Sequence, residues 1–437
     1  MMEDPRYSKI GKVYNGFGTF QLKSVLIKND AGDWGTEPNE NAVGIIRSTN
    51  FNNNGKLDLS DIAYRTLSPQ KFEDKKLSSS DILIERSGGS DTQPVGRIGY
   101  ITDDMTDKKL SFANFIQRIS LDETVDAKFV YYCLQQMYEM GITASMQFQT
   151  TGIRNLDWKF YLKTYLPKPT KEEQTAIANI LSKVDEAIAS VQNSITAAER
   201  LKKSLMQNLL TGKMKPDGTF RTSEEFYIDE NFGKVPVGWE VKRGTEITTK
   251  ITKGQSPKWQ GFDYQQEGIL FVTSENIQNG YIDISKPKYL PLEFNNKIRN
   301  SQLEKGDILI NIVGASIGRC AIFNIDIECA NINQAVCVFR PDAENDSMFL
   351  SLYLQSETTQ NRLFRTQVET ARANLSLGDF RKFKFVIPQK EEQIKIANRI
   401  NLFDIEREEL IERILVLERL KKSLMQNLLT GKVTIIR

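Results

Sequence analysis

Apolar residues in two stretches of the chain follow the spacing of long helices. They recur at three- and four-residue steps between residues 177 and 209 and again between residues 396 and 428. This period places them on one stripe of a helix. Glutamates stand near the start of each stretch, and a TGK sequence ends it, so the glycine stands where a helix stop is favoured. About 43 residues at ~1.5 Å each give a helix of ~65 Å. Helices of this length exceed those of an ordinary domain, and we expect the two to pack on each other as an antiparallel coiled coil.

The remaining stretches have the pattern of short strands. Apolar runs such as VGII, DILI, GILFV and AVCVF alternate with turns rich in Gly, Asn, Ser and Asp. They predict two mixed α/β domains with curved sheets, called front domains below. A polar segment with Pro and Gly separates the two halves and has the composition of a linker. The fold class is therefore α+β, with these predicted boundaries: front domain 1 at 1–168, long helix 1 at 169–213, linker at 214–234, front domain 2 at 235–387 and long helix 2 at 388–437.

The chain also repeats itself. LKKSLMQNLLTGK occupies residues 201–213 and returns unchanged at 420–432, and the same offset aligns the rest of the two helical stretches. Weaker echoes link the front domains, where LSSSDILI corresponds to LEKGDILI and VGRIGYI to IGRCAIF. The chain is thus an internal duplication of a unit of roughly 200 residues, too few copies for a solenoid. Two like units predict pseudo-two-fold symmetry.

Composition narrows the possible chemistry. The chain has no histidine, which excludes Ser-His-Asp and Cys-His nucleophile systems and the usual zinc sites. It has no GxxxxGK[ST] phosphate loop, and its four cysteines show no CxxC pairing. An apolar run long enough to span a bilayer and a signal-peptide core are both missing, so we expect a cytoplasmic protein without membrane contact. The net charge of +2 permits nucleic-acid binding only through local patches.

Four motifs together carry a family resemblance. They are EEQxxIA at the start of each long helix, LMQNLLTGK at its end, VPVGW at the start of the second unit, and GDILI followed by a turn that ends in GR. This set, in this doubled order, resembles the specificity subunit of type I restriction–modification enzymes over nearly the whole chain. One feature departs from the pattern, because the first unit has no obvious counterpart of PVGW.

The resemblance implies a non-catalytic subunit that recognises double-stranded DNA. Its front domains would be two pseudo-two-fold-related target-recognition domains, each reading one half of a bipartite asymmetric target. The two long antiparallel coiled-coil helices would set the spacer between the halves and dock two methyltransferase subunits that methylate adenine N6. Restriction subunits, the motor-nucleases, would join through them. The resemblance implies that S-adenosylmethionine, Mg and ATP belong to those partner subunits and that this chain binds no cofactor.

Candidate contacts follow from the polar loops and from the repeated helix segments. Base edges are read by Arg or Lys at guanine and by Asn or Gln at adenine. An arginine that both units keep is expected to contact phosphate or to hold the fold. The candidate DNA contacts are Arg47, Ser48, Asn50, Asn52, Asn53, Arg86, Arg97, Arg154, Lys253, Gln255, Ser256, Lys258, Trp259, Thr273, Ser274, Asn276, Gln278, Arg319 and Arg372. The candidate partner or helix-pair contacts are Glu173, Gln174, Leu205, Gln207, Asn208, Leu209, Glu392, Gln393, Leu424, Gln426, Asn427 and Leu428. No catalytic or metal-binding residue is predicted.

Several alternatives stay open at this point. The Asn- and Gly-rich loops also fit hairpin turns without a ligand. The chain as a whole could instead be a stand-alone DNA-modifying or nuclease enzyme, or a coiled-coil adaptor without sequence readout. The identical run has a second possible origin as well, since near-identical coding DNA could serve as a recombination site that exchanges recognition domains.

Overall fold

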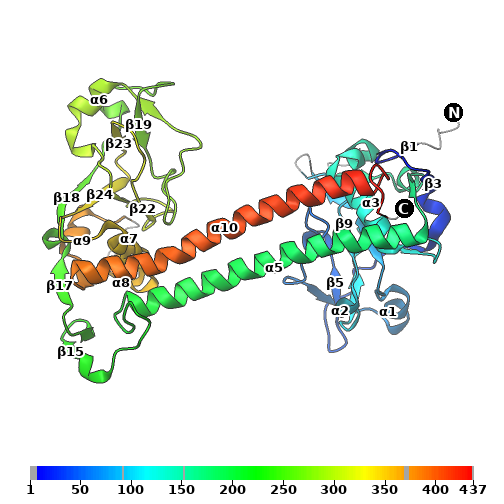
Figure 1. Ribbon diagram of the computed structural model, residues 1–437, viewed down its shortest axis with the longest axis horizontal. Helices are drawn as coiled ribbons and strands as arrows, with labels where there is room; N and C mark the ends of the chain where they lie inside the picture. The colour runs from blue at the N-terminus through cyan, green and yellow to red at the C-terminus, as the bar shows by residue number, and fades with distance from the viewer. Residues whose placement is uncertain (1–6, 91–92, 151–152, 369–373, 436–437) are drawn as a thin grey trace. The chain divides into compact units, whose positions relative to one another are not determined.

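The computed structural model of the chain is organised as two compact units (Figure 1). The residues that it describes are 7–90, 93–150, 153–368 and 374–435. Unit 1 contains residues 1–192 and 412–437, and unit 2 contains residues 193–411. Each unit therefore combines one front domain with about half of each long helix. The compact units differ from the sequence repeats in this respect, because the division falls within both helices.

The two long helices are α5 (Lys171–Leu209) and α10 (Lys390–Leu428). Each has 39 residues, which corresponds to about 58 Å of ideal helix. In unit 1, Asp185 contacts Lys421 at 2.8 Å. In unit 2, Glu199 contacts Arg407 and Lys202 contacts Asp404, so residue numbers rise on one helix as they fall on the other. The expected antiparallel pairing of the helices is confirmed inside each unit.

The front domain of unit 1 contains small, mostly antiparallel sheets. Strand orders are β4–β11–β7–β9, β10–β5–β6, β12–β13–β8, β14–β3 and β1–β2. The elements are β1 (Tyr7–Ser8), β2 (Gly11–Lys12), β3 (Gly18–Gln21), β4 (Leu26–Ala31), β5 (Val43–Ile46), β6 (Ala63–Arg65), α1 (Pro69–Lys75), β7 (Ile82–Glu85), β8 (Ser87–Gly89), β9 (Ile98–Tyr100), α2 (Asp103–Thr106), β10 (Leu110–Phe112), β11 (Ile116–Leu121), α3 (Ala127–Glu139), β12 (Gln147–Thr150), β13 (Ile153–Leu156), α4 (Trp158–Tyr161) and β14 (Tyr165–Lys168).

The front domain of unit 2 repeats this plan with fewer strands. Sheet β18–β24–β21–β22 corresponds to β4–β11–β7–β9, and β20–β19–β23 corresponds to β6–β5–β10, including the one parallel pairing in each. The elements are β15 (Phe226–Asp229), β16 (Gly233–Pro236), β17 (Glu240–Arg243), β18 (Thr248–Lys253), β19 (Ile269–Val272), β20 (Tyr289–Leu290), α6 (Leu292–Lys297), β21 (Ile308–Asn311), β22 (Cys320–Ile322), β23 (Ala330–Ile332), β24 (Val336–Pro341), α7 (Ser347–Gln355), α8 (Glu357–Val368), α9 (Leu377–Lys382) and β25 (Lys384–Ile387). The predicted α+β class and the internal duplication are confirmed.

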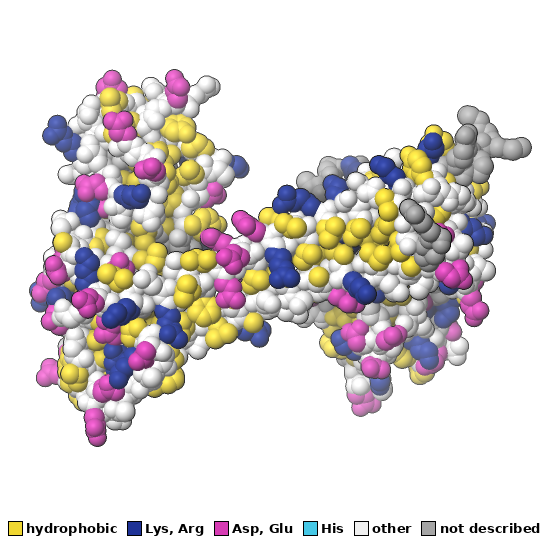
Figure 2. All heavy atoms as spheres, in the orientation of Figure 1, with side chains coloured by type: hydrophobic (Ala, Val, Ile, Leu, Met, Phe, Trp, Pro, Cys, Tyr) yellow, Lys and Arg dark blue, Asp and Glu magenta, His cyan; other side chains and the backbone are white. Residues whose placement is uncertain are grey.

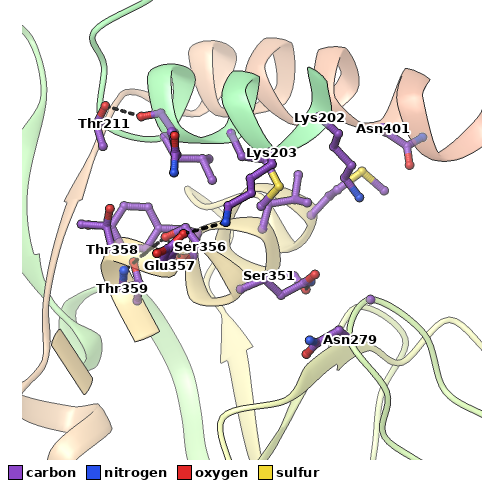
Figure 3. A pocket seen from close by; sticks show the side chains of 18 of the residues that line it. Lys202, Lys203, Thr211, Asn279, Ser351, Ser356, Glu357, Thr358, Thr359 and Asn401 are labelled. Atoms are coloured by element: carbon purple, nitrogen blue, oxygen red, sulfur yellow. Dashed lines mark hydrogen bonds and ion pairs between the residues drawn. The ribbon is translucent and has the colours of Figure 1, made fainter. Parts of the chain in front are cut away.

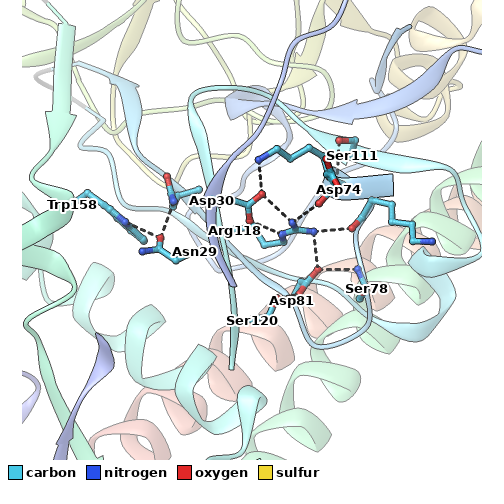
Figure 4. Close-up of polar contacts among 12 residues, drawn as sticks. Asn29, Asp30, Asp74, Ser78, Asp81, Ser111, Arg118, Ser120 and Trp158 are labelled. Carbon is cyan, nitrogen blue, oxygen red and sulfur yellow. Dashed lines mark hydrogen bonds and ion pairs between the residues drawn. The ribbon is translucent and has the colours of Figure 1, made fainter. Parts of the chain in front are cut away.

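The DILI motif of each unit is a buried strand that starts at a buried aspartate. Asp81 accepts a hydrogen bond from the backbone of Ser78 and one from the Ser120 hydroxyl (Figure 4). Its counterpart Asp307 accepts from the backbone of Glu304 and from the Arg340 guanidinium. A buried carboxylate needs such donors. The shared Asp therefore fixes the turn that leads into β7 and β21.

Arg118 is a buried arginine of unit 1, and the equivalent position of unit 2 holds no arginine. Arg118 is almost fully buried and donates to both carboxylate oxygens of Asp30 at 2.9 and 3.0 Å (Figure 4). It also donates to the backbone carbonyls of Lys76 and Asp74. The strand register places Val338 of unit 2 at the position of Arg118, because these residues pair with Leu83 and Leu309. The ion pair between Arg118 and Asp30 is therefore a feature of the unit 1 sheet that the unit 2 sheet does not share.

Candidate functional site

Three segments of unit 1 that carry candidate residues come together. The loop after β5 is tied to the turn before β9 by Arg97, which donates to the backbone carbonyls of Ser48 (2.9 Å) and Phe51 (2.5 Å). At the tip of this loop, Asn53 accepts a hydrogen bond from Gln93 at 3.0 Å. Strand β13, which carries Arg154, pairs with β8 next to this turn. The structure thus groups the predicted polar loops of unit 1 at one place.

Several of these side chains are engaged inside the domain. Asn50 is buried, accepts from the backbone of Arg47 at 2.9 Å, and donates to the carbonyls of Asp58 and Asp61. Arg47 pairs with the Asp61 carboxylate at 2.9 Å. Asn50 has its donors and acceptor occupied in shaping the loop, as an Asx side chain commonly does. Of the candidates in this loop, Asn52 and Asn53 are the more exposed. Arg86, after β7, is exposed as well and donates to Gln117 at 3.2 Å.

In unit 2 the KGQSPKWQG loop leaves the sheet at the end of β18. A Cβ atom on Gly254 would lie 1.8 Å from the carbonyl oxygen of Ile332, so only glycine fits where the loop crosses β23. The tip is a 3-10 turn held by a 2.6 Å bond from Gln260 to Gln255 and by Lys297, which donates to the Gln260 carbonyl. The side chain of Trp259 is 85% exposed on this tip. The other candidates in the loop also reach the surface: Lys253, Gln255 and Lys258 are exposed, and Ser256 is partly exposed.

The second loop of unit 2, after β19, has the internal plan of its counterpart in unit 1. Asn276 accepts from the backbone of Thr273 at 2.8 Å and donates to the Asp283 carbonyl at 2.9 Å, as Asn50 does in its own loop. Thr273 and Asn276 are buried, and Ser274 and Gln278 are partly exposed. Gln278 accepts a hydrogen bond from the exposed Arg319 at 3.1 Å. The candidate Arg372 lies outside the described residues.

At the start of each long helix, a buried glutamine joins the helix to its own front domain. Gln174 accepts from the backbone of Asp126 and donates to the Pro169 carbonyl. Gln393 makes the same two bonds, to Asp346 and Pro388. Since Asp126 and Asp346 cap α3 and α7, the EEQ motif orients the helix against the domain. The neighbouring glutamates differ: Glu173 caps its own helix at Thr170, and Glu392 binds Arg221 and Trp239.

At its other end, each long helix stops on an aromatic residue of a front domain. A Cβ on Gly212 would lie 2.2 Å from Pro236 and 3.2 Å from the Trp239 ring, and a Cβ on Gly431 would lie 2.9 Å from the Phe17 ring. Both glycines have positive φ, the conformation that ends helices. Tyr14 also donates its backbone N–H to the Thr430 carbonyl at 3.0 Å. The TGK ends are therefore closely packed on the domains.

This packing identifies the missing counterpart of PVGW. Phe17 and Trp239 each follow a glycine with positive φ and precede the strand that pairs next to the long helix. The backbone N–H of each aromatic residue donates to the carbonyl three positions earlier, Tyr14 for Phe17 and Pro236 for Trp239, and both hydrogen bonds are 3.0 Å long. The NGF segment of unit 1 thus occupies the place of VGW. The sequence pattern did not reveal this match, because the two segments share only the glycine and the aromatic character.

One side of each repeated run borders a hollow. In unit 2 a cleft of about 980 Å³ is lined by Met206, Gln207 and Thr211 from α5 and its end, and Lys203 reaches across it to Glu357 at 3.1 Å (Figure 3). In unit 1 the equivalent residues Met425, Gln426 and Thr430 line a smaller groove of about 260 Å³. The same three positions therefore face a recess in both units.

The other candidates in the repeated runs divide by burial. The leucines face inward: Leu209 and Leu428 are buried, and Leu205 and Leu424 are partly buried against the cores. Asn208 and Asn427 donate to backbone carbonyls four residues earlier in their own helices. Gln207 and Gln426 are exposed. The two glutamines are thus the candidates of this group with the most accessible side chains.

Apolar side chains are exposed along α10 (Figure 2). Leu402 and Ile405 in unit 2 are 62% and 46% exposed, and Val416 in unit 1 is 58% exposed. Large exposed apolar surface on a soluble protein commonly marks an interaction site. These residues therefore add to the recesses as candidate partner surfaces.

Three of the four cysteines are buried. Cys133, Cys320 and Cys337 are buried, and burial raises the pKa of the Cys320 and Cys337 thiols to about 12. Thiols of this kind are poor nucleophiles near neutral pH. Among the described residues, no group of three or more His, Cys, Asp or Glu side chains could hold a metal ion. The helices found in this part of the chain include none with the length and apolar character to cross a membrane.

Comparison with known proteins identifies relatives over most of the chain. The family model for the type I restriction modification DNA specificity domain matches residues 15–200 and 236–419. The MjaVIII specificity subunit of Methanocaldococcus jannaschii is 30% identical over 298 residues, covering 66% of this chain and 67% of that protein. The EcoBI specificity subunit of Escherichia coli is 27% identical over 288 residues, covering 64% and 59%. The putative MjaX specificity subunit of M. jannaschii is 23% identical over 442 residues, covering 99% and 97%.

Solved structures share the fold at lower identity. The S subunit of a type I restriction–modification system from M. genitalium has a TM-score of 0.53 and 17% identity, with 97% of this chain and 99% of that chain covered. A chain from a study of complex assembly in a type I restriction–modification system has a TM-score of 0.56 and 15% identity, with coverage of 97% and 100%. At these identities the likeness supports the fold alone.

Proposed function

Because this chain belongs to the family of type I restriction–modification DNA specificity domains and is a specificity subunit, we propose that it reads a bipartite asymmetric DNA target. Each front domain reads one half of the target. The helix pair sets the spacer between the halves and docks two copies of a methyltransferase subunit, which methylates adenine N6. Restriction subunits join through these partners. S-adenosylmethionine, Mg and ATP are bound by the partners rather than by this chain.

One observation carries the proposal: identical helix ends face recesses in both units, while the loops of the two front domains differ. Met206, Gln207 and Thr211 have exact sequence counterparts in the second repeated run, and both sets border a hollow. Two like surfaces suit two copies of one partner. Different loops suit two different half-sites. Like ends with unlike loops are what an asymmetric target bound by identical partners requires.

Solvent-facing polar and aromatic side chains are the proposed DNA contacts. In unit 2 these side chains lie in the KGQSPKWQG loop and beside Gln278, where lysines supply charge for phosphate and Trp259 supplies a stacking face. In unit 1 the tip of the loop after β5 and the neighbouring arginines take this role. The proposed set is Asn52, Asn53, Arg86, Arg154, Lys253, Gln255, Ser256, Lys258, Trp259, Ser274, Gln278 and Arg319. Arg47, Asn50, Thr273 and Asn276 are instead assigned to shaping the loops.

A domain exchange tests the proposal. The purified chain is combined with its methyltransferase, and methylated adenines are mapped before and after residues 235–387 are replaced by the corresponding domain of a relative with another target. We expect one half of the methylated sequence to change and the other half to stay. Inserting about one helical turn within residues 185–200 should change the spacer and leave both half-sites readable.

Three outcomes would contradict the proposal. If the exchanged chain directs methylation to the same sequence as before, the chain acts as an adaptor without sequence readout. If the purified chain alone modifies or cleaves DNA with Mg²⁺ or S-adenosylmethionine, it is an enzyme in its own right. DNA affinity that does not fall as salt rises would also contradict binding through phosphate contacts.

A further inference from the structure

Two arginines occupy the same place in the two front domains but differ in their surroundings. Arg97 in unit 1 stands directly before β9, and Arg319 in unit 2 directly before β22. These two strands are edge strands of the corresponding four-stranded sheets. Glu85 donates its backbone N–H to the Arg97 carbonyl at 2.9 Å, and Asn311 donates to the Arg319 carbonyl at 2.9 Å. The return bonds, from the preceding glycines to the carbonyls of Glu85 and Asn311, are 2.9 and 2.8 Å. The backbones are therefore equivalent, and only the side chains differ.

In unit 1 the arginine is held inside the domain. Arg97 donates to both carboxylate oxygens of Glu85 at 2.8 and 2.7 Å and to the carbonyls of Ser48 and Phe51. Its side chain is 11% exposed, and that of Glu85 is 1% exposed. A bidentate, buried pair of this kind is a strong interaction, and removing one partner leaves an uncompensated charge. Arg97 therefore joins a loop to the sheet and is not available to a ligand.

In unit 2 a single change releases the arginine. Asn311 stands where unit 1 has Glu85, so the carboxylate that would bind the guanidinium is missing. The Asn311 amide donates to the Ser274 carbonyl at 2.9 Å, which is the carbonyl equivalent to that of Ser48. Asn311 therefore takes over the task of joining loop to sheet. Arg319 is exposed and donates to the Gln278 side chain at 3.1 Å.

We propose that Arg319 and Gln278 form a base-reading pair of the second front domain, while Arg97 only holds the first domain together. The proposal rests on the proposed function and names residues that determine specificity for one half-site. A guanidinium matches the two acceptors of guanine in the major groove, and a glutamine amide matches adenine. Gln278 also donates to the Glu275 carbonyl at 3.2 Å, which fixes the oxygen that orients Arg319. Gln278 lies in the loop after β19, the loop that also contains Ser274, and Arg319 reaches it from the turn before β22.

The test uses the full chain with its methyltransferase and a duplex carrying the mapped target. Affinity is measured for this duplex and for a panel with single base-pair changes in the half-site that unit 2 reads. For Arg319→Ala we expect a loss of about 5- to 150-fold on the unchanged duplex, with discrimination lost at one or two adjacent base pairs. The melting temperature should stay unchanged, because the side chain is exposed. Arg319→Lys should not restore the discrimination, since an ammonium group cannot bind bidentately.

A second variant does not remove the arginine at all. Asn311→Glu rebuilds the carboxylate of unit 1, and we expect it to capture Arg319 and to reproduce the binding defect of Arg319→Ala. The double variant, Asn311→Glu with Arg319→Ala, should bind DNA no more weakly than either single variant. Asn311→Gln, which lacks the charge, should bind DNA more tightly than Asn311→Glu. Arg97→Ala is the contrasting variant, because its expected effect is a lower melting temperature.

The outcomes separate this inference from the proposed function. If the unaltered complex binds its target and Arg319→Ala has unchanged affinity, or loses affinity equally on every duplex of the panel, the base-reading role is wrong while DNA recognition stands. If the unaltered complex shows no preference for any sequence, the proposed function itself fails.

Discussion

Replacing Gly431 by alanine tests whether the end of the repeated run is seated on the front domain of unit 1. Gly431 has a φ of +72°, and a Cβ atom there would lie 2.9 Å from both the Phe17 ring and the Tyr14 carbonyl oxygen. Contacts this short cannot be kept, so the helix end or the ring must move. Since the Tyr14 N–H also binds the Thr430 carbonyl, movement at this point disturbs a backbone hydrogen bond as well.

The expected loss of stability has two parts. A non-glycine residue in the left-handed region loses about 1–2 kcal/mol. Forcing an extra methyl group into a close-packed contact adds about 1–3 kcal/mol. Gly141, in the same unit, separates the two parts, because its φ is +71° and nothing lies within 4 Å of a Cβ placed there. Gly141→Ala should therefore show the backbone strain alone.

Thermal unfolding of the two variants measures the difference. For a unit of this size, 1 kcal/mol corresponds to about 2–4 °C in Tm. We expect Gly431→Ala to melt about 2–12 °C below Gly141→Ala, and Gly212→Ala to behave similarly in unit 2, where the Cβ would lie 2.2 Å from Pro236. Equal Tm values for Gly431→Ala and Gly141→Ala would refute the close packing of the helix end on Phe17.

Three further predictions concern single features of the units. Arg118→Val alone should destabilise unit 1 by about 3–5 kcal/mol in chemical unfolding, because the buried Asp81 loses its cation at 3.9 Å and Asp30 keeps only Lys75. Asp30→Thr with Arg118→Val, which copies Thr252 and Val338 of unit 2, should be less unstable than Arg118→Val, because it removes the Asp30 charge, but should stay below the unaltered chain, because Asp81 keeps its charge. A double variant as unstable as the single one would contradict this. Burial raises the pKa of Asp30, but hydrogen bonds and charges from Arg118 and Lys75 outweigh it and lower the pKa. A lowered pKa stabilises the fold above the unfolded value of about 3.9 and loses that contribution as pH falls through the folded value, so the stability gap between the unaltered chain and Asp30→Asn should shrink below about pH 4 and not at neutral pH. Trp259→Ala should leave Tm unchanged, since the ring is 85% exposed, and weaken DNA binding about 5- to 150-fold; unchanged affinity would exclude stacking.

Sequence patterns were sufficient to predict the helices, the duplication and the fold class. Helical periodicity and helix-stop glycines are local signals, and the repeated run extends them to two equivalent places in the chain. The antiparallel pairing also followed, because two long apolar stripes in one chain need a partner surface. Residue types in the polar loops named candidate DNA contacts, and the structure brings three of the segments that carry them together in unit 1.

Only the tertiary structure separated the candidate residues that face solvent from those that shape the loops. Asn50 and Asn276 have the composition of base-reading residues, yet both are buried and bonded to their own loops. Phe17 could not be matched to Trp239 until both were found against helix-ending glycines. For the asparagines the deciding contacts are made within the folded loop, and for Phe17 they are made with a helix end distant along the chain; residue type alone records neither.

The two GR turns give the clearest example. The sequence by itself determined that Arg97 and Arg319 occupy equivalent turns. Their availability depends on the residue that faces each of them across the neighbouring strand, Glu85 in one unit and Asn311 in the other. A carboxylate there binds the guanidinium, whereas an amide binds the loop carbonyl in its place. Strand pairing brings these groups within hydrogen-bond distance, and for that reason the fold rather than the motif decides which arginine faces solvent.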